Sequence, residues 1–386
     1  MKITLVAPTE MPSRRANTIQ VAKMAQALKQ LGHEVYLLVP APNRSIADQL
    51  NRAFNWQDFA EHYGLHEKFP VKWLATNPKL RRYDYGLRSL LWARQWGADL
   101  IYTRLPQCAA LASSAGFSVV YEVHDFPRGN VNPFLLRTFI WGRGKRRLIV
   151  ITHALANDIT KAFGITHDQV DVVIAPDGVD IERYEDIPDP QQARSILDTT
   201  IANFPNRFTA GYSGHFYAGR GLQLLFELAA RQPDMNFLIM GGENQVVEEA
   251  RAHANQAKLT NIFLTGFIPN AELPLYQASC EVLLMPYQKQ VSGSSGGDIA
   301  PYLSPMKVFE YLACGRVIIS SDLPVLREVI NEKFAFLLPS EQVDLWLATL
   351  RKIAESPTMR EEMGELARKE ARKYSWQSRA VIILGG

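Results

Sequence analysis

Short apolar runs alternate with longer amphipathic segments along the chain. Residues 3–8 form a β-rich run, and residues 13–31 then place apolar side chains at helical spacing until Gly32 ends the pattern. Residues 33–40 form a second β-rich run. This order predicts a β-α-β unit, and strands that are apolar throughout predict a parallel sheet covered by helices on both faces.

The same alternation continues through the front half and starts afresh after residue 200. Further front strands are predicted at 99–103, 118–122, 148–152 and 170–176. The second series predicts strands at 208–213, 236–240, 262–265, 282–285 and 317–320, with helices at 222–231, 246–256, 271–278 and 306–313. The acidic, proline-containing run IERYEDIPDPQQARSI separates the two series. We therefore predict an α/β protein of two doubly wound Rossmann-like domains facing a central cleft, residues 1–185 and 186–371.

Charge adds an asymmetry between the halves. The chain of 386 residues has a net charge of +3, but residues 1–180 hold 22 basic and 15 acidic side chains and residues 181–386 hold 20 and 24. Three cysteines without a Cys-x-x-Cys spacing argue against a disulfide framework and a zinc site. No stretch approaches 18 uncharged apolar residues, so the sequence predicts a cytoplasmic protein.

The loops after the strands contain one candidate phosphate site. No G-x-G-x-x-G follows the first strand, which disfavours a nicotinamide or flavin enzyme. In the second half, GYSGHFYAGRG joins a strand to a helix N-terminus, where backbone amides, His215 and Arg220 can bind an anion. The alternative is a glycine turn with two surface side chains.

A second candidate lies in YLSPMKVFEYLACG. Ser304 is a predicted N-cap, Pro305 suits the first helical position, and Lys307 and Glu310 lie three apart on one helix face. The ammonium can meet phosphate oxygens while the carboxylate accepts hydrogen bonds from vicinal hydroxyls. An intrahelical ion pair between Lys307 and Glu310 is the alternative.

These segments, in order, resemble a known family. GYSGHFYAGRG, LIMGG, LTGFIPNAELPLYQASCEVLLMP and SPMKVFEYLACGRVIISSDLPVLREVI look like the nucleotide-sugar domain of the retaining family 4 glycosyltransferases, which have the GT-B fold. LGHEV, EVHD and APDGVD occupy the family's expected places in the front half, and Tyr374-Ser375-Trp376 resembles the final element that crosses back. The resemblance implies that residues 372–386 return to the first domain.

The resemblance also implies a set of site residues. Arg220, Glu310 and the front-domain His124 match the catalytic positions, with Asp125 as an orienting partner or helix cap. The donor's diphosphate is expected between His215, Arg220 and the turn Ser304, Met306 and Lys307; Glu310 is expected to hold the ribose, and the base to pack near Gly266, Phe267 and Ile268.

Three positions depart from the family's pattern. The usual glycine pair of the first loop is replaced by residues 13–17, where Arg14 or Asn17 could substitute. The first of two family glutamates is Tyr302, and Asp298 in the run SGSSGGDIAP could reach in instead or be a solvated loop residue. His215 stands where arginine is commoner.

The expected function is retaining transfer of a hexose, with UDP-glucose preferred, to a saccharide or lipid-linked saccharide. No Asp-x-Asp occurs, so we expect metal independence and no cofactor besides the nucleotide-sugar substrate. Residues 72–147 contain 13 Lys and Arg against 4 Asp and Glu, which suits either an anionic membrane at the inner face of the cell or a plain basic surface, and RNA is disfavoured. A catalytically idle sugar-nucleotide-binding subunit and a nicotinamide oxidoreductase are the competing functions.

Overall fold

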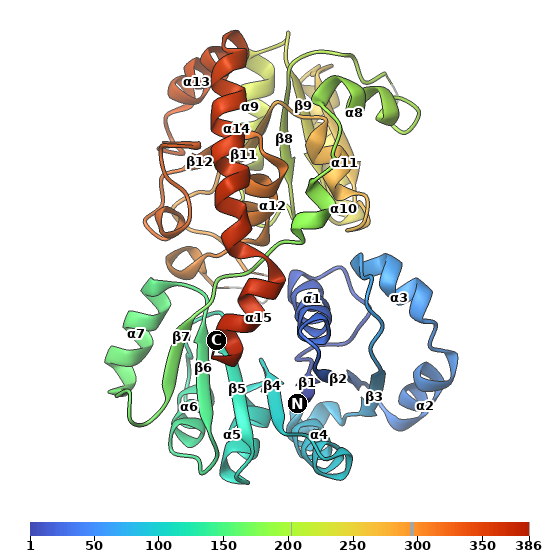
Figure 1. Ribbon diagram of the computed structural model, residues 1–386. Coiled ribbons are helices and arrows are strands. Elements are labelled where there is room, and N and C mark those ends of the chain that lie inside the picture. The colour runs from blue at the N-terminus through green and yellow to red at the C-terminus, as the bar shows by residue number, and fades with distance from the viewer. Residues whose placement is uncertain (202, 294–296, 386) are drawn as a thin grey trace. The chain divides into compact units, whose positions relative to one another are not determined.

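The computed structural model describes residues 1–201, 203–293 and 297–385 and divides into two compact units. Unit one comprises Met1–Asp177 and Trp376–Gly386, and unit two comprises Gly178–Ser375 (Figure 1). The division after Asp177 precedes the predicted boundary at residue 185, and the returning segment begins at Trp376 instead of residue 372.

Unit one contains a seven-stranded sheet whose strands all pair in parallel, in the order β3-β2-β1-β4-β5-β6-β7. Most of these strands are buried apolar runs, as expected for a sheet covered on both faces. The strands are β1 Lys2–Val6, β2 Glu34–Ala41, β3 Val71–Ala75, β4 Leu100–Thr103, β5 Ser118–Val123, β6 Arg146–Val150 and β7 Asp171–Ile174.

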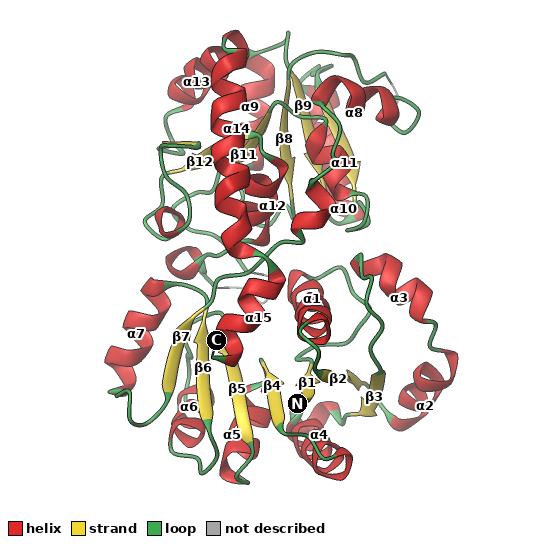
Figure 2. Cartoon of the chain, viewed as in Figure 1, coloured by secondary structure: helices red, strands yellow, loops and turns green. Residues whose placement is uncertain are grey.

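Helices cover both faces of this sheet (Figure 2). Helix α15, the returning segment, packs beside α1, while α4, α5 and α6 lie side by side as a separate layer. The helices of unit one are α1 Ala16–Gln30, α2 Arg44–Ala53, α3 Trp56–Tyr63, α4 Tyr83–Trp96, α5 Pro106–Ser114, α6 Val131–Ile140, α7 His153–Phe163 and α15 Trp376–Leu384.

Unit two repeats the architecture with a six-stranded parallel sheet in the order β10-β9-β8-β11-β12-β13. The carboxyl ends of its strands therefore share one edge, where a doubly wound sheet binds ligands. The strands are β8 Thr209–Ser213, β9 Asn236–Met240, β10 Ile262–Gly266, β11 Val282–Met285, β12 Val317–Ser321 and β13 Ala335–Leu338.

Alternate strand residues of unit two enter two different cores. In β9, Leu238 and Met240 join one apolar cluster, whereas Phe237 and Ile239 join the other. The first cluster includes α12 and α14, and the second includes α9 and α13. The helices are α8 Pro190–Leu197, α9 Leu222–Arg231, α10 Asn244–Gln256, α11 Leu273–Ala278, α12 Met306–Cys314, α13 Val343–Glu355 and α14 Pro357–Ala371.

Both units are doubly wound parallel α/β folds, as the sequence predicted. The predicted bounds of α9, β9 and β11 agree with the structure. The sequence prediction missed β3 and β13, short strands at sheet edges. Within the described residues, no helix is both long and apolar enough to cross a bilayer.

Candidate functional site

The first part of the site is the loop that joins β8 to α9 at the carboxyl edge of unit two. Gly219 and Gly221 have φ values of +81° and +83°, in the left-handed region that favours glycine. A Cβ at Gly219 would lie 1.9 Å from the carbonyl oxygen of Gln290, and one at Gly221 would lie 1.9 Å from that of Pro286. The two glycines thus let this loop pack closely against the segment after β11. Arg220 lies between the two glycines, and residues of that segment hold its side chain.

Arg220 is fixed by an aromatic side chain that the sequence analysis did not name. Its Nη1 donates to the Tyr287 hydroxyl at 3.1 Å, and its guanidinium carbon lies 5.2 Å from the centroid of the Tyr287 ring. Its Nε is buried and has no hydrogen-bond partner in the described part of the chain. The guanidinium therefore keeps one donor for a ligand.

Lys307, on the first turn of α12, is a buried amine that makes no hydrogen bond within the described residues. Its Nζ lies 3.8 Å from the centroid of the Tyr212 ring and 5.5 Å from that of Tyr287. Burial, reinforced by the nearby Arg220, lowers the pKa of Lys307 well below its ordinary value. The alternative of a simple ion pair with Glu310 is not what the structure shows, because no such contact forms.

The N-terminus of α12 differs from the sequence prediction by one residue. Pro305 is the N-cap, with φ −79° and ψ 133°, and Met306 is the first helical residue, so Ser304 is not the cap. Proline fits because its ring fixes φ and its missing N–H lies outside the helix. The Ser304 hydroxyl consequently makes no helix-capping bond, and it is buried without a partner among the described residues.

Glu310 lies one turn further along α12 and is partly exposed. Its Oε2 accepts a hydrogen bond from Gln277 Nε2 at 3.3 Å, and Gln277 is in turn held by the Tyr184 hydroxyl at 2.8 Å. Burial raises the pKa of Glu310, against the opposing effect of Arg183. Its carboxylate thus protonates at a higher pH than an ordinary glutamate.

The remaining predicted donor residues lie at the same edge of the sheet. The His215 ring stacks on Tyr217, with centroids 5.0 Å apart and an interplanar angle of 10°, in the loop that holds Arg220. Gly266 ends β10 with φ +73°, and Phe267 and Ile268 follow it, all partly exposed. The structure therefore gathers the predicted diphosphate, ribose and base positions at the carboxyl ends of β8, β10 and β11.

Asp298 and Tyr302 lie in the loop between β11 and α12. Asp298 Oδ1 accepts the backbone N–H groups of Val291 and Ala300 at 2.9 and 3.0 Å, which ties the loop after β11 together. Tyr302 ends a short 3-10 turn, Ala300–Tyr302, and is buried. Residues 294–296 of the run that carries Asp298 lie outside the described residues.

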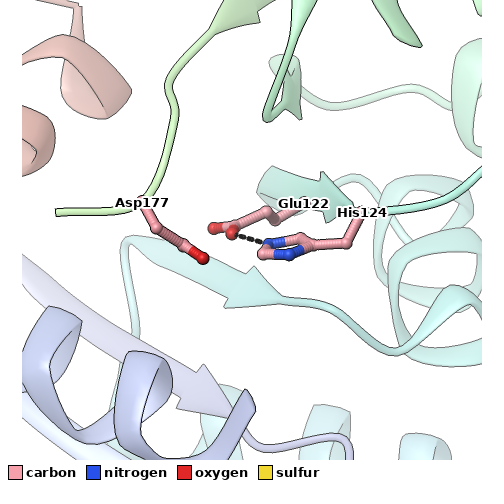
Figure 3. Close-up of side chains that lie close together, drawn as sticks. All are labelled: Glu122, His124 and Asp177. Atoms are coloured by element: carbon pink, nitrogen blue, oxygen red, sulfur yellow. Dashed lines mark hydrogen bonds and ion pairs between the residues drawn. The ribbon is translucent and has the colours of Figure 1, made fainter. Parts of the chain in front are cut away.

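In unit one, His124 belongs to a buried polar network at the end of β5. His124 Nε2 and Glu122 Oε1 form a short hydrogen-bonded contact, shown in Figure 3 together with Asp177. Glu122 also pairs with Arg379 of α15, whose Nη2 lies 2.8 Å from Oε1. Burial, with the nearby cation Arg104, lowers the pKa of His124, so the ring is predominantly neutral at pH 7.

The carboxylates of this network come close enough together to suggest a cation site. One ligand atom each of Glu122, His124 and Asp177 lies within 4.8 Å of the others. Both Glu122 oxygens already accept hydrogen bonds from the Arg379 guanidinium, however. The positive charge that balances Glu122 is therefore supplied by the chain itself.

The last three predicted residues occupy loop and helix-start positions of unit one. Arg14 is exposed before α1, and Asn17 in its first turn donates to the Thr9 hydroxyl at 3.1 Å. Asp125 Oδ1 accepts the N–H of Phe126 at 2.8 Å, and the Asp125 carboxylate lies 3.7 Å from Arg128. Asp125 accordingly supports the turn after β5.

Sequence reasoning missed Tyr287, Gln277, Glu122 and Arg379. Glu122 stands inside the EVHD motif, two residues before His124. Arg379 carried a signal, because it is a cation inside an otherwise mostly apolar terminal helix, Trp376–Leu384. A buried arginine in such a helix requires a carboxylate partner.

Two family models match the chain. The model described as "Glycosyl transferases group 1" matches residues 198–370, and that described as "Glycosyltransferase Family 4" matches residues 18–183. Together they cover most of both units.

Two curated relatives illustrate the range of similar enzymes. The phosphatidyl-myo-inositol mannosyltransferase of Mycolicibacterium smegmatis is 22% identical over 97% of this chain and 90% of its own length. The 2-deoxystreptamine glucosyltransferase of Streptomyces kanamyceticus is 28% identical over 60% of this chain and 62% of its own length.

Solved structures share the fold. A sucrose-phosphate synthase from Thermosynechococcus elongatus is 16% identical, with a TM-score of 0.72 over 98% of this chain and 96% of that one. The Anabaena protein HepE, solved with UDP and glucose, is 16% identical, with a TM-score of 0.71 over 100% of this chain and 97% of that one. These likenesses confirm the predicted GT-B fold.

Proposed function

This chain belongs to the family 4, group 1 glycosyltransferases, of GT-B fold, and on that premise we propose that it is a retaining, metal-independent hexosyltransferase. Its general activity, transfer of a sugar in glycoconjugate synthesis, follows from the family. The proposed donor is a nucleoside-diphosphate sugar, and the proposed acceptor is a saccharide or a lipid-linked saccharide.

The observation that carries the proposal is the buried amine of Lys307, which makes no hydrogen bond to any residue that the structure describes. An ammonium without an anionic partner is costly to bury, so its retention needs a compensating ligand. Arg220 Nε and Ser304 Oγ are also buried without partners in the described residues, and Arg220 shares Tyr287 with Lys307. Three donors left open beside a helix N-terminus are an arrangement suited to a diphosphate.

The chemistry asked of these groups is stabilisation of a leaving group. As the bond from the anomeric carbon to the phosphate oxygen breaks, positive charge grows on the sugar and negative charge on the diphosphate. Cations and amides fixed at that phosphate stabilise the transition state more than the ground state. With retention, the acceptor oxygen bonds to the same face of the carbon, and its proton passes to the departing phosphate oxygen. His124 is the proposed catalytic residue of the front domain, and Arg220 and Glu310 those of the rear domain.

UDP-glucose is the donor to test first, and GDP-mannose the second. The names of the relatives support both sugars, because they include a glucosyltransferase and a mannosyltransferase. The nucleotide base would contact the segment of Gly266, Phe267 and Ile268, which begins at the last residue of β10.

The test is hydrolysis of each nucleotide sugar in the absence of acceptor. We expect slow release of UDP or GDP that is unchanged by EDTA, because Arg220 and Lys307 replace a divalent cation. Binding without turnover would instead favour the idle subunit, and loss of turnover on chelation would refute metal independence. Tight NADH binding would favour the oxidoreductase.

We also propose that residues 72–147 carry a surface that contacts an anionic membrane. Apolar side chains are exposed on α4 at Leu87 and Leu91, and on and after α6 at Phe134 and Trp141, which are 65% and 71% exposed. Both helices pack against α5, and exposed basic residues accompany them: Arg88, Arg94, Arg137, Arg143 and Lys145. Exposed aromatic and basic side chains together suit the interface of an anionic bilayer.

We expect the full chain to co-sediment with vesicles that contain anionic lipid and to be released by salt. The double variant Phe134→Ser/Trp141→Ser should bind such vesicles about tenfold more weakly, because it loses the inserting side chains. A matched control is Ile196→Ser/Leu366→Ser, which removes two exposed apolar side chains from unit two. Equal binding by all three proteins would leave this surface as a plain basic face.

A further inference from the structure

The C-terminal helix α15 brings a single arginine into the interior of unit one. Arg379 is 3% exposed, and its Nε donates to the carbonyl oxygen of Pro176 at 2.7 Å. Its Nη2 donates to the carbonyl oxygen of Ala175 at 3.1 Å. These bonds hold the segment that follows β7 and leads to Asp177.

The remaining donors of Arg379 meet Glu122 and Tyr102. Nη2 donates to Glu122 Oε1 at 2.8 Å, Nη1 donates to Oε2 at 3.3 Å, and Nη1 also lies 3.2 Å from the Tyr102 hydroxyl. Gln20 Nε2 donates to Glu122 Oε1 at 2.8 Å, and the Tyr102 hydroxyl donates to Oε2. Both oxygens of Glu122 therefore accept hydrogen bonds, from side chains on α1 and β4 near the start of the chain and on α15 at its end.

We propose that Arg379 is a positioning residue for His124, acting through Glu122. The guanidinium keeps Glu122 ionised and fixes its plane, and the ionised carboxylate accepts Nε2–H of His124. That contact selects one tautomer and one ring orientation, which leaves Nδ1 as the imidazole nitrogen for other contacts. The part of His124 in sugar transfer rests on the proposed function, whereas the orientation of its ring does not.

The charges around the two groups agree with this arrangement. Burial alone would raise the pKa of Glu122, but Arg379 and His124 hold it well below its ordinary value. The groups that face His124 are Glu122 on β5, Arg104 after β4 and Asp177 after β7, with Arg379 of α15 behind Glu122. Of these groups, Arg104 lowers the pKa of His124, and the carboxylates of Glu122 and Asp177 raise it. Burial and Arg104 together have the larger effect, so the pKa of His124 is lowered overall.

The contact of Arg379 with Glu122, and of Glu122 with His124, predicts how substitutions change the pKa of His124. In Arg379→Gln, Glu122 loses its cation, and His124 becomes the nearest group able to balance it, so the pKa of His124 should rise. In Glu122→Gln the partner charge disappears, so the pKa of His124 should fall further. Arg379→Lys keeps the charge and should stay close to the wild type.

The experiment is an NMR titration of the histidine ring protons in the full chain. The chain has eight histidines, and the His124 signal is assigned by its absence in His124→Gln. Arg147→Gln is the matched control, because Arg147 also holds α15, through the carbonyl oxygen of Ile383 at 2.8 Å, and pairs with Asp171 instead of Glu122. The titration needs no donor or acceptor, so its outcome is independent of the proposed function.

We expect the His124 midpoint to move up by about one pH unit in Arg379→Gln and to stay unchanged in Arg147→Gln. In parallel, kcat should fall at least about tenfold in Arg379→Gln, while donor affinity, which resides in unit two, stays constant. An unchanged His124 midpoint in Arg379→Gln, or the same shift in Arg147→Gln, would overturn the proposal.

A second comparison covers the case in which Arg379→Gln does not fold. Replacing a buried ion pair as a unit is tolerated better than removing one partner. The double variant Arg379→Met/Glu122→Gln should therefore fold, and its His124 midpoint should match that of Glu122→Gln alone. A clear difference between these two midpoints would show that Arg379 acts on His124 by some route other than Glu122.

Discussion

Replacing Lys307 by methionine should lower turnover by about 10²- to 10³-fold while leaving the protein as stable as the wild type or more so. Methionine keeps most of the volume of lysine but removes the ammonium. The wild-type amine is buried against Tyr212 and lacks a hydrogen-bond acceptor in the described residues, so folding gains little from its charge. In the proposed function, by contrast, transition-state stabilisation at the leaving phosphate depends on that charge.

The opposite signs of the two effects separate a catalytic from a structural lysine. Turnover is measured as release of the nucleoside diphosphate, and stability as the midpoint of thermal unfolding. Lys289→Met is the control, because Lys289 lies in the same unit, is 79% exposed and pairs with Glu341 on the surface. A Lys307→Met protein that unfolds at a lower temperature yet keeps its turnover would assign the amine to cation–π packing against Tyr212.

Gly214, which follows β8, leaves space for the amine of Lys307. Gly214 has φ +141°, and a Cβ there would lie 2.6 Å from Lys307 Nζ. The glycine that follows β8 therefore makes room for the amine, in addition to giving the loop its turn. This explains in physical terms why GYSGHFYAGRG carries a glycine at its fourth position.

Much of the fold was predictable because most apolar runs in the sequence correspond to a single buried strand or helix face. Strands such as β9 and β11 are buried on both faces, so every residue except Asn236 is apolar and the run stands out. Helix α9 is predictable for the complementary reason, since Gly221 and Arg231 bound a clear amphipathic pattern. Strands β3 and β13 lie at sheet edges and mix buried with partly buried residues, which weakens the same signal.

The site was predictable only as far as its motifs extend along the chain. Arg220, Lys307 and Glu310 sit in local patterns of glycine turn and helix start. Tyr287 and Arg379 act through contacts between segments far apart in sequence, as in the pairing of Arg379 with Glu122. Spacing cannot report such pairs, because it contains no information on which segments meet in space.

The N-terminus of α12 shows how a local rule can fail by one residue. Ser304 and Pro305 fit the usual order of an N-cap followed by proline at the first helical position. The structure makes Pro305 itself the cap, and the Ser304 hydroxyl is buried without a hydrogen-bond partner among the described residues. A serine released from capping is free to donate to a ligand, which supports its proposed contact with the diphosphate.

Replacing Glu310 by glutamine should weaken binding of the nucleotide sugar by about 10- to 100-fold at pH 8, through loss of a charged acceptor for the ribose hydroxyls. Burial raises the pKa of Glu310 above its ordinary value of 4.5, so the wild-type carboxylate is lost as the pH falls through that raised value. The amide of the variant does not titrate. The ratio of the two dissociation constants should therefore be large at pH 8 and fall toward one as the pH approaches 5.

Calorimetric titration of both proteins with the nucleotide sugar at a series of pH values measures this ratio. The diphosphate of a nucleotide sugar is fully ionised over this range, and every other titratable group of the chain is present in both proteins. Their ratio thus isolates the one carboxyl that differs. Glu248→Gln is the control, because this residue of the same unit is 68% exposed and pairs with Arg251 on the surface at 2.6 Å. If the ratio stays constant from pH 5 to pH 8, Glu310 does not bind the donor as a carboxylate, and its place on α12 has to be explained by its bond with Gln277.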